Sequence, residues 1–399
     1  MQIFKSVVLL FFATFIFGCT GLTKSRTIPE DESWQTLTLN NGFKAHLKSI
    51  PGEAVSIRFL VRAGSYHETP KQAGYAHFLE HMAFNGTPSF PGNEALQAFE
   101  ESGISFVDHI NAFTSHTETV YLLDMPDDDK LNDAITWFGE IATSLTLSDK
   151  EIENEKGVVL AEQRQWGRPT TLEAKTFAAI ASASYRGHSN IIGTPDSIRH
   201  LSPQALREFY YSNYTPERSE IIITGDFDLT HVKAKIRNAF EDWVTPKTAN
   251  RASHPDAVLP GEPFITRVSP LESPALWLML DLGANPLATQ QDYEQNTFQL
   301  LAATAISERL KLRAAQAFVP IHNVDVSVNS WSEARFLNIA LSYDRTWQDD
   351  AHAFLAYELA ATRDHGFLPL EIESTSGKWS QRWQHNLNYL QVKWLREGF

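Results

Sequence analysis

The sequence predicts an α+β protein of two domains. Its 399 residues exceed what one typical core uses, because domains usually contain about 100–200 residues. Two patterns recur along the chain: apolar residues that alternate with polar ones, typical of half-buried strands, and apolar residues at helical spacing. The two patterns mix without a strict β-α-β alternation, which favours α+β over a doubly wound parallel sheet.

The first domain is expected to begin near Trp34 with strands. Apolar residues alternate on both sides of Asn41-Gly42, a dipeptide typical of hairpin turns, and again over 55–61. Ser148 to Glu151 fits a capping box that opens a long helix. Further elements are expected at 74–84 (helix), 93–103 (short helix), 111–124 (strand), 128–145 (helix), 148–166 (helix), 220–224 (strand) and 232–243 (helix).

The second domain is expected to follow a linker at residues 244–263, which contain four prolines and little apolar sequence. The first domain is therefore assigned to 34–243 and the second to 264–399. Strands are expected at 275–282 and 338–343, and helices at 298–315 and 347–365. The final segment, 372–399, resembles a helix that stops in mid-pattern, so the second domain is expected to be incomplete at its C-terminus.

Residues 1–19 resemble an export signal rather than part of the fold. Lys5 precedes an apolar run that is too short for a membrane span of about 20 residues. The run ends in Gly18-Cys19, as in a bacterial lipoprotein signal with lipid on Cys19; a plain secretory signal with an incidental cysteine also fits. We expect an exported, periplasmic protein whose only membrane contact is the lipid on Cys19, followed by a flexible tether at 20–33.

The composition narrows the partners. The net charge is −14, which argues against a nucleic-acid partner or a broad basic surface for anionic membranes. Cys19 is the only cysteine, so the chain can form no internal disulfide and depends on its core for stability.

A histidine-rich segment gives the main chemical signal. His77 and His81 are four residues apart on a predicted helix, so both rings point to one face and can share one zinc ion. Glu80 lies beside them, close enough to take a proton from metal-bound water. The order His-x-x-Glu-His is the inverted zincin arrangement. The alternative is that they are two ordinary helix histidines without a metal, one packed and one solvated.

A catalytic zinc with three protein ligands needs one more donor. Glu151, Glu155 and Glu162 share one face of the helix predicted from Ser148. A solvated acidic stripe is the alternative, but the apolar residues 158–160 indicate that the middle of this helix is buried. Buried carboxylates require a metal or a polar partner.

Several segments in order resemble the pitrilysin/insulinase/mitochondrial-processing-peptidase family. They are Gly74 to Thr87 with its His-x-x-Glu-His core, Asn111 to Ser115, Glu155 to Glu162, and Tyr214 to Asp226. The resemblance covers most of 34–250 and is looser beyond the linker. It implies a half-unit of two similar α+β domains, each with a mainly antiparallel sheet packed with helices.

The resemblance also implies roles for single residues. His77, His81 and Glu162 match the zinc ligands, and Glu80 matches the general base. Glu155 matches an acidic position that we interpret as orienting a ligand or the base, although a helix-surface glutamate is the alternative. Asn111 matches a residue that holds substrate backbone, and the strand around Ala112 would pair with an extended peptide. His109 and His116 match no ligand position.

The expected function is that of a zinc metalloendopeptidase with one Zn²⁺ per chain, acting on short or unfolded peptides. In the family, two half-units close into a chamber, and the second half supplies an arginine and a tyrosine to the substrate. We find no second half here, so a homologous half-unit or partner chain is expected. The alternative is a non-catalytic family member that serves as a partner or assembly subunit; such members typically lose metal ligands.

Overall fold

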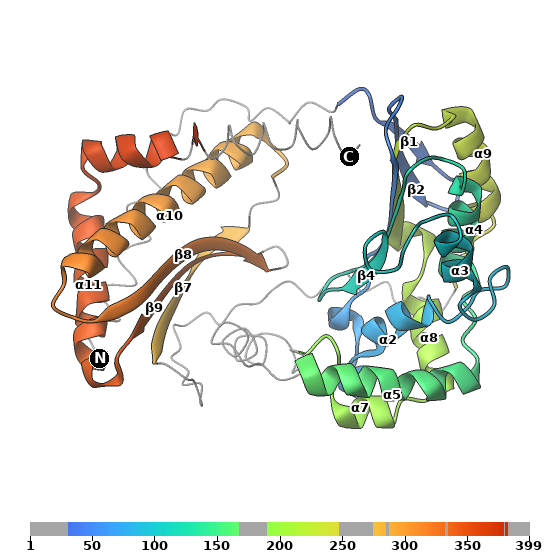
Figure 1. Ribbon diagram of the computed structural model, residues 1–399, viewed down its shortest axis with the longest axis horizontal. Helices are drawn as coiled ribbons and strands as arrows, with labels where there is room; N and C mark the ends of the chain where they lie inside the picture. Colours follow the sequence, from blue (N-terminus) through green and yellow to red (C-terminus); the bar gives the residue numbers. More distant parts are fainter. Residues whose placement is uncertain are drawn as a thin grey trace. The chain divides into compact units, whose positions relative to one another are not determined.

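The described residues form two compact units. The computed structural model in Figure 1 describes residues 31–166, 190–246, 274–284, 287–331, 334–378 and 380–381. Residues 31–166 and 190–246 belong to one unit, and those from 274 onward to the other. Each unit has its own hydrophobic core. The predicted leader, most of the tether and most of the linker lie outside the described residues.

A six-stranded sheet organises the N-terminal unit, in the order β1-β2-β6-β3-β5-β4. The strands are β1 (Gln35–Thr38), β2 (Lys44–Ser49), β3 (Val55–Val61), β4 (Ile110–Thr114), β5 (Thr119–Met125) and β6 (Ser219–Gly225). Neighbouring strands are antiparallel except β2 and β6, which are parallel. β6 therefore lies between two strands that come much earlier in the sequence.

Aromatic side chains hold two helices on this sheet. The helices are α4 (Leu131–Thr143) and α9 (Leu229–Phe240). Phe43 stacks on Phe240 of α9 at 4.2 Å between ring centroids, and Phe59 of β3 lies 6.0 Å from Phe138 of α4. All four rings are fully buried, and burial of such large apolar surfaces is the main source of stability for this layer.

The other helices of this unit carry or support the polar cluster described below. They are α2 (Tyr75–Met82), α3 (Glu94–Glu100), α5 (Asp149–Trp166), α7 (Pro195–Arg199) and α8 (Pro203–Asn213), with 3₁₀ turns at Ser65–His67, Pro70–Gln72 and Pro216–Arg218. α2 packs against both α5 and β4, and Figure 1 shows α5 running past the end of α2.

Most predicted elements of this unit are confirmed, but the single strand predicted over 111–124 is wrong. The structure divides it into β4 and β5, which pair as a hairpin. The turn forms because the Ser115 hydroxyl accepts hydrogen bonds from the backbone N–H groups of Thr117 and Glu118, both at 3.1 Å. A serine in this role is hard to separate from a strand serine by pattern alone.

The C-terminal unit contains a three-stranded antiparallel sheet in the order β7-β9-β8. Its strands are β7 (Ala275–Ala284), β8 (Ile321–Trp331) and β9 (Ala334–Tyr343), and its helices are α10 (Gln290–Gln316) and α11 (Gln348–His365), with a 3₁₀ turn at Arg345–Trp347. Strand β8 was not predicted, and α10 begins at Gln290 rather than residue 298. The reason is a cap: the Thr289 hydroxyl accepts from the N–H of Asp292.

A buried arginine links the helical layer of the C-terminal unit. Arg309 in α10 donates through Nε to Glu371 at 2.8 Å, through Nη1 to the hydroxyl of Thr362 in α11 at 2.9 Å, and through Nη2 to the carbonyl of Gly366 at 2.8 Å. The guanidinium also lies 4.5 Å from the ring centroid of Phe367. The chain thus supplies acceptors and a stacking partner for this buried charge.

Both units pack an antiparallel or mainly antiparallel sheet against helices, which confirms the predicted α+β class. Among the described residues, none of the helices is both long enough and apolar enough to span a membrane.

Candidate metal centre

Helix α2 carries both histidines of the motif. Its apolar residues Phe78, Leu79 and Met82 are fully buried in the core, which fixes the rotation of the helix. His77 is 7% exposed, and its ring lies 4.6 Å from that of His81. The four-residue spacing therefore places both rings on one face, as the sequence predicted.

The start of α2 is held by a buried carboxylate and a close chain crossing. Glu68 accepts hydrogen bonds from the N–H groups of Gly74 at 2.9 Å and Ala76 at 2.8 Å. Burial raises the pKa of Glu68 to about 8, although these backbone donors act in the opposite direction. Gly74 has φ +93°, and a Cβ there would lie 2.6 Å from the carbonyl oxygen of Ile192. Only glycine fits this position without a shift.

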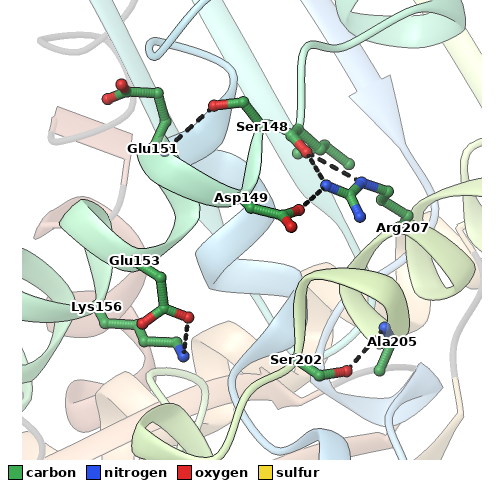
Figure 2. Close-up of polar contacts among 9 residues, drawn as sticks. Ser148, Asp149, Glu151, Glu153, Lys156, Ser202, Ala205 and Arg207 are labelled. Atoms are coloured by element: carbon green, nitrogen blue, oxygen red, sulfur yellow. Dashed lines mark hydrogen bonds and ion pairs between the residues drawn. The ribbon is translucent and has the colours of Figure 1, made fainter.

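Helix α5 is anchored at its beginning to α8. The Ser148 hydroxyl accepts from the N–H of Glu151 at 3.2 Å, which is half of the predicted capping box. Arg207 of α8 donates to the carbonyl of Leu147 at 2.7 and 3.0 Å and forms an ion pair with Asp149 (Figure 2). These contacts fix where α5 starts, and hence where Glu155 and Glu162 lie relative to α2.

Glu162 meets the two histidines. Its carboxylate oxygens lie 3.6 Å from His77 Nε2 and 3.2 Å from His81 Nε2. Two ligand atoms bound tetrahedrally to one zinc at about 2.1 Å would be roughly 3.4 Å apart. His77, His81 and Glu162 form the one group of three potential metal ligands found among the described residues.

The Glu155 carboxylate contacts His81 on the side of the ring that faces away from Glu162. It accepts from His81 Nδ1 at 2.8 Å and from Asn85 Nδ2 at 2.6 Å. With a proton on Nδ1, the lone pair of His81 would be available to a metal on Nε2, which is the nitrogen that faces Glu162. The Nδ1 atom of His77 is buried and has no hydrogen-bond partner in the described part of the chain.

The electrostatics of this cluster favour a cation. Burial lowers the pKa of His81, but hydrogen bonds to Glu155 and Glu162 outweigh it and raise the pKa to about 9. Hydrogen bonds from His77 and His81 hold the pKa of Glu162 well below its usual range. The carboxylates that attract a proton to His81 would equally stabilise a divalent cation at the same point.

Glu80 lies on the same helix but makes different contacts. Its side chain is buried, with 9% of the residue exposed. Burial raises its pKa, and this effect is opposed by His77 and by the Thr114 hydroxyl. Thr114 Oγ1 donates to Glu80 Oε2 at 2.6 Å. This contact leaves Oε1 of Glu80 without a hydrogen bond from the described residues.

Asn111 and Ala112 lie on β4, at the edge of the described sheet. β4 pairs with β5 on one side, where Ala112 lies opposite Tyr121. Asn111 is exposed, and its Oδ1 accepts from the N–H of Ala112 at 2.8 Å. The outer edge of this strand has the geometry that an extended peptide can join.

Some residues differ from what sequence reasoning indicated. Glu151, which shares the predicted acidic face, contacts Lys150 and Asn154 instead of the histidines. Thr114, Asn85 and Glu68 were missed as parts of the cluster. Thr114 lies within a segment on which the family resemblance rests, so it could have been found. Glu68 and Asn85 act through contacts that form only on folding, to backbone N–H groups at the start of α2 and to the Glu155 side chain.

The donor set fits zinc. Two imidazole nitrogens and one carboxylate, with space for water, are a common ligand set of catalytic zinc sites. The lone pair of His81 Nε2 is directed by Glu155, as orientation of a metal ligand requires.

Comparison with known proteins decides the family. The sequence model described as "Insulinase (Peptidase family M16)" matches residues 45–193, which contain the whole cluster. The model described as "Peptidase M16 inactive domain" matches residues 200–375. The chain belongs to the insulinase family, peptidase family M16. This confirms the resemblance seen in the sequence.

Two relatives of this M16 chain are named as probable zinc proteases. It is 28% identical to "Probable zinc protease PqqL" of Escherichia coli (strain K12) over 88% of this chain and 39% of the relative. The identity is 34% to the protein of that name from Haemophilus influenzae (strain ATCC 51907 / DSM 11121 / KW20 / Rd), over 57% of this chain and 25% of the relative. The chain thus spans well under half the length of these relatives.

A solved structure confirms the fold of this M16 chain. The crystal structure of the periplasmic protease PqqL from Escherichia coli matches with a TM-score of 0.73 and 23% identity, over 93% of this chain and 41% of the PqqL chain. At that identity the match speaks to the fold alone.

Proposed function

We propose that this chain is the metal-carrying half of a zinc metalloendopeptidase. The observation that carries the proposal is the convergence of His77 Nε2, His81 Nε2 and the Glu162 carboxylate from two separate helices, with Glu80 beside them. His77, His81 and Glu162 would hold one zinc ion per chain.

The residues around the site have distinct tasks in this mechanism. Zinc, when bound, supplies a Lewis acid that polarises the scissile carbonyl and acidifies water. Glu80 takes the proton of the attacking water through its free oxygen and later passes it to the leaving amine. Glu155 keeps the proton of His81 on Nδ1. The buried position of the cluster limits bulk water around Glu80.

Peptides would bind along the outer edge of β4. Backbone pairing with the segment around Ala112 holds an extended chain, and the exposed amide of Asn111 can hydrogen-bond its backbone. A substrate must offer free backbone N–H and C=O groups to join a sheet edge, which favours short or unfolded peptides over folded proteins.

We also propose that full activity requires a second half-unit or a homologous partner chain. The support is that the PqqL relatives are more than twice as long as the matched region. We propose further that the chain is exported to the periplasm and carries a lipid on Cys19. We also propose that its two domains span 34–243 and 264–399. PqqL of Escherichia coli is named a periplasmic protease.

The test is a Glu80→Gln variant. It should keep zinc, because Glu80 is not a ligand, and should lower peptide cleavage by roughly 100- to 10,000-fold, the usual contribution of a general base. Zinc content and cleavage of a quenched fluorescent peptide would be measured, with Glu151→Gln as a matched control. Cleavage by Glu80→Gln at the wild-type rate contradicts the mechanism. If the wild type and both variants bind zinc but none cleaves the peptide, the non-catalytic partner role is favoured.

A further inference from the structure

Thr114 contacts the one carboxylate of the cluster that is not assigned to the metal or to a histidine. Its Oγ1 lies 2.6 Å from Glu80 Oε2. An ionised carboxylate can only accept, so the threonine hydroxyl is the donor. Hydrogen bonds to a charged acceptor are about twice as strong as neutral ones, and this contact is shielded because Glu80 is buried.

A second hydroxyl leaves the Thr114 proton for Glu80. Thr119 lies opposite Thr114 across the β4–β5 hairpin, with the two hydroxyl oxygens 3.4 Å apart. Thr119 Oγ1 donates to the carbonyl of Ala63 at 2.9 Å. Because that proton is used, Thr119 can only accept from Thr114. Its oxygen lies 3.4 Å away, whereas Glu80 Oε2 lies at 2.6 Å, so the Thr114 proton is directed to Glu80.

The position of Thr114 in the sheet joins two parts of the proposed site. β4 is the edge strand along which a peptide would pair, and successive side chains of a strand point to opposite faces. Asn111 and Phe113 are exposed on one face, whereas Thr114 is on the face that packs against α2. A single residue thus belongs to the peptide-binding strand and holds the base.

We infer that Thr114 is a positioning residue: it holds Oε2 of Glu80 so that Oε1 is directed to the reacting water, and it links peptide pairing on β4 to the orientation of the base. This inference rests on the proposed peptidase function and names a residue that the zinc-site motif does not contain.

Two variants separate the hydroxyl from the shape of the side chain. Thr114→Val keeps the branched shape without the hydroxyl, and Thr114→Ser keeps the hydroxyl. In the zinc-loaded full chain, Thr114→Val should lower kcat by roughly 10- to 100-fold, the effect of a slightly misplaced catalytic group, with KM unchanged; Thr114→Ser should restore most of kcat. Thr136→Val, which removes a half-buried hydroxyl on α4, is the matched control. An unchanged kcat, or no rescue by serine, overturns the inference.

A second measurement needs no turnover. Urea unfolding of wild type, Thr114→Val, Glu80→Ala and the double variant forms a thermodynamic cycle. The penalty of Thr114→Val on the unfolding equilibrium constant should be at least roughly tenfold larger with Glu80 present than with alanine there. Equal penalties in both backgrounds overturn the contact. A zinc-loaded wild type that cleaves nothing contradicts the proposed function, whereas the cycle still decides whether Thr114 holds Glu80.

Discussion

The two units both bury charged side chains between helices, but they complete these networks differently. In the C-terminal unit, Arg309 finds a carboxylate, a hydroxyl and a carbonyl within the same unit. In the N-terminal unit, the carboxylates of Glu80, Glu155 and Glu162 meet two histidines, and no lysine or arginine of the described chain pairs with any of them.

The difference separates a structural network from a binding site. A buried charge whose partners are all supplied by the chain stabilises or specifies the fold. A cluster with excess negative charge and imidazole nitrogens around a common point is suited to a cation from outside, as we propose for the N-terminal unit. The first three predictions below each perturb one of the two networks, and the last concerns a histidine outside both.

The largest effect is expected from Glu162→Gln. The wild-type chain should bind about one zinc per chain, as a single three-ligand site requires. Loss of the charged ligand should weaken zinc binding by more than about 100-fold, beyond the range seen when only the partner of a ligand is changed. Zinc content after dialysis and competition with a chelator measure this. Glu151→Gln, on the same helix, should bind zinc like the wild type; undiminished zinc binding by Glu162→Gln would remove Glu162 from the site.

Arg309→Met should destabilise the C-terminal unit without changing the metal site. It leaves Glu371 without its cation and removes three donors, which should cost about 2–4 kcal/mol in the free energy of unfolding. The side chain of Glu371 is 26% exposed, so hydration of its carboxylate reduces the loss of stability. Chemical denaturation gives the free energy and zinc content gives the reference. Arg313→Met, whose Nε lies 3.9 Å from Glu358 on an exposed side chain, should cost less than about 1 kcal/mol. A similar cost for both variants would contradict the interpretation that Arg309 finds all its partners within the C-terminal unit.

Glu155→Gln should give an intermediate effect. It keeps a hydrogen-bond acceptor for His81 Nδ1 but removes the charge that directs the lone pair to Nε2. Zinc affinity should fall by about 10- to 100-fold, less than for Glu162→Gln, in the same competition assay. If the two variants lost affinity equally, Glu155 would have to be a ligand itself.

The smallest effect concerns a histidine near the site but outside the network. Burial lowers the pKa of His116 to about 4, below the unfolded value near 6.5. Between these values the unfolded chain binds a proton that the folded chain excludes, so this contribution is present above pH 6.5 and is lost as the pH falls toward 4. The difference of about 2.5 units corresponds to about 3.4 kcal/mol for a fully buried group. Because His116 is only half-buried, solvent screening should reduce the loss to about 2 kcal/mol. His116→Gln should flatten the stability profile in this window, whereas His200→Gln, which is exposed, should keep the wild-type slope.

The sequence predicted the motif helix better than its surroundings. The spacing of His77 and His81 fixes their common face by helical geometry alone, and the family resemblance predicted roles for Glu80, Glu155 and Glu162. The sequence pattern did not separate β4 from β5, because the turn between them depends on the hydroxyl of Ser115. Strand β8 was missed although Val324, Val326 and Val328 alternate with polar residues, the pattern typical of a half-buried strand.

The partners of the cluster were less predictable because they depend on tertiary contacts. Glu68 acts on backbone N–H groups six and eight residues away, and only the turn of the chain around Gly74 brings them together. Asn85 directly follows the helix predicted at 74–84, and its amide binds Glu155. Neither contact has a local sequence pattern.

The place of β6 in the sheet has a consequence for the order of folding. β6 lies between β2 and β3, so the core that supports α2 is not closed until Ser219–Gly225 has been made. Nascent chains that end before this strand hold His77, His81 and Glu162 but lack the central strand of the sheet, and such non-local pairing forms late in folding. Zinc capture should therefore require that Ser219–Gly225 has paired between β2 and β3, which makes metal binding a readout of sheet closure during folding.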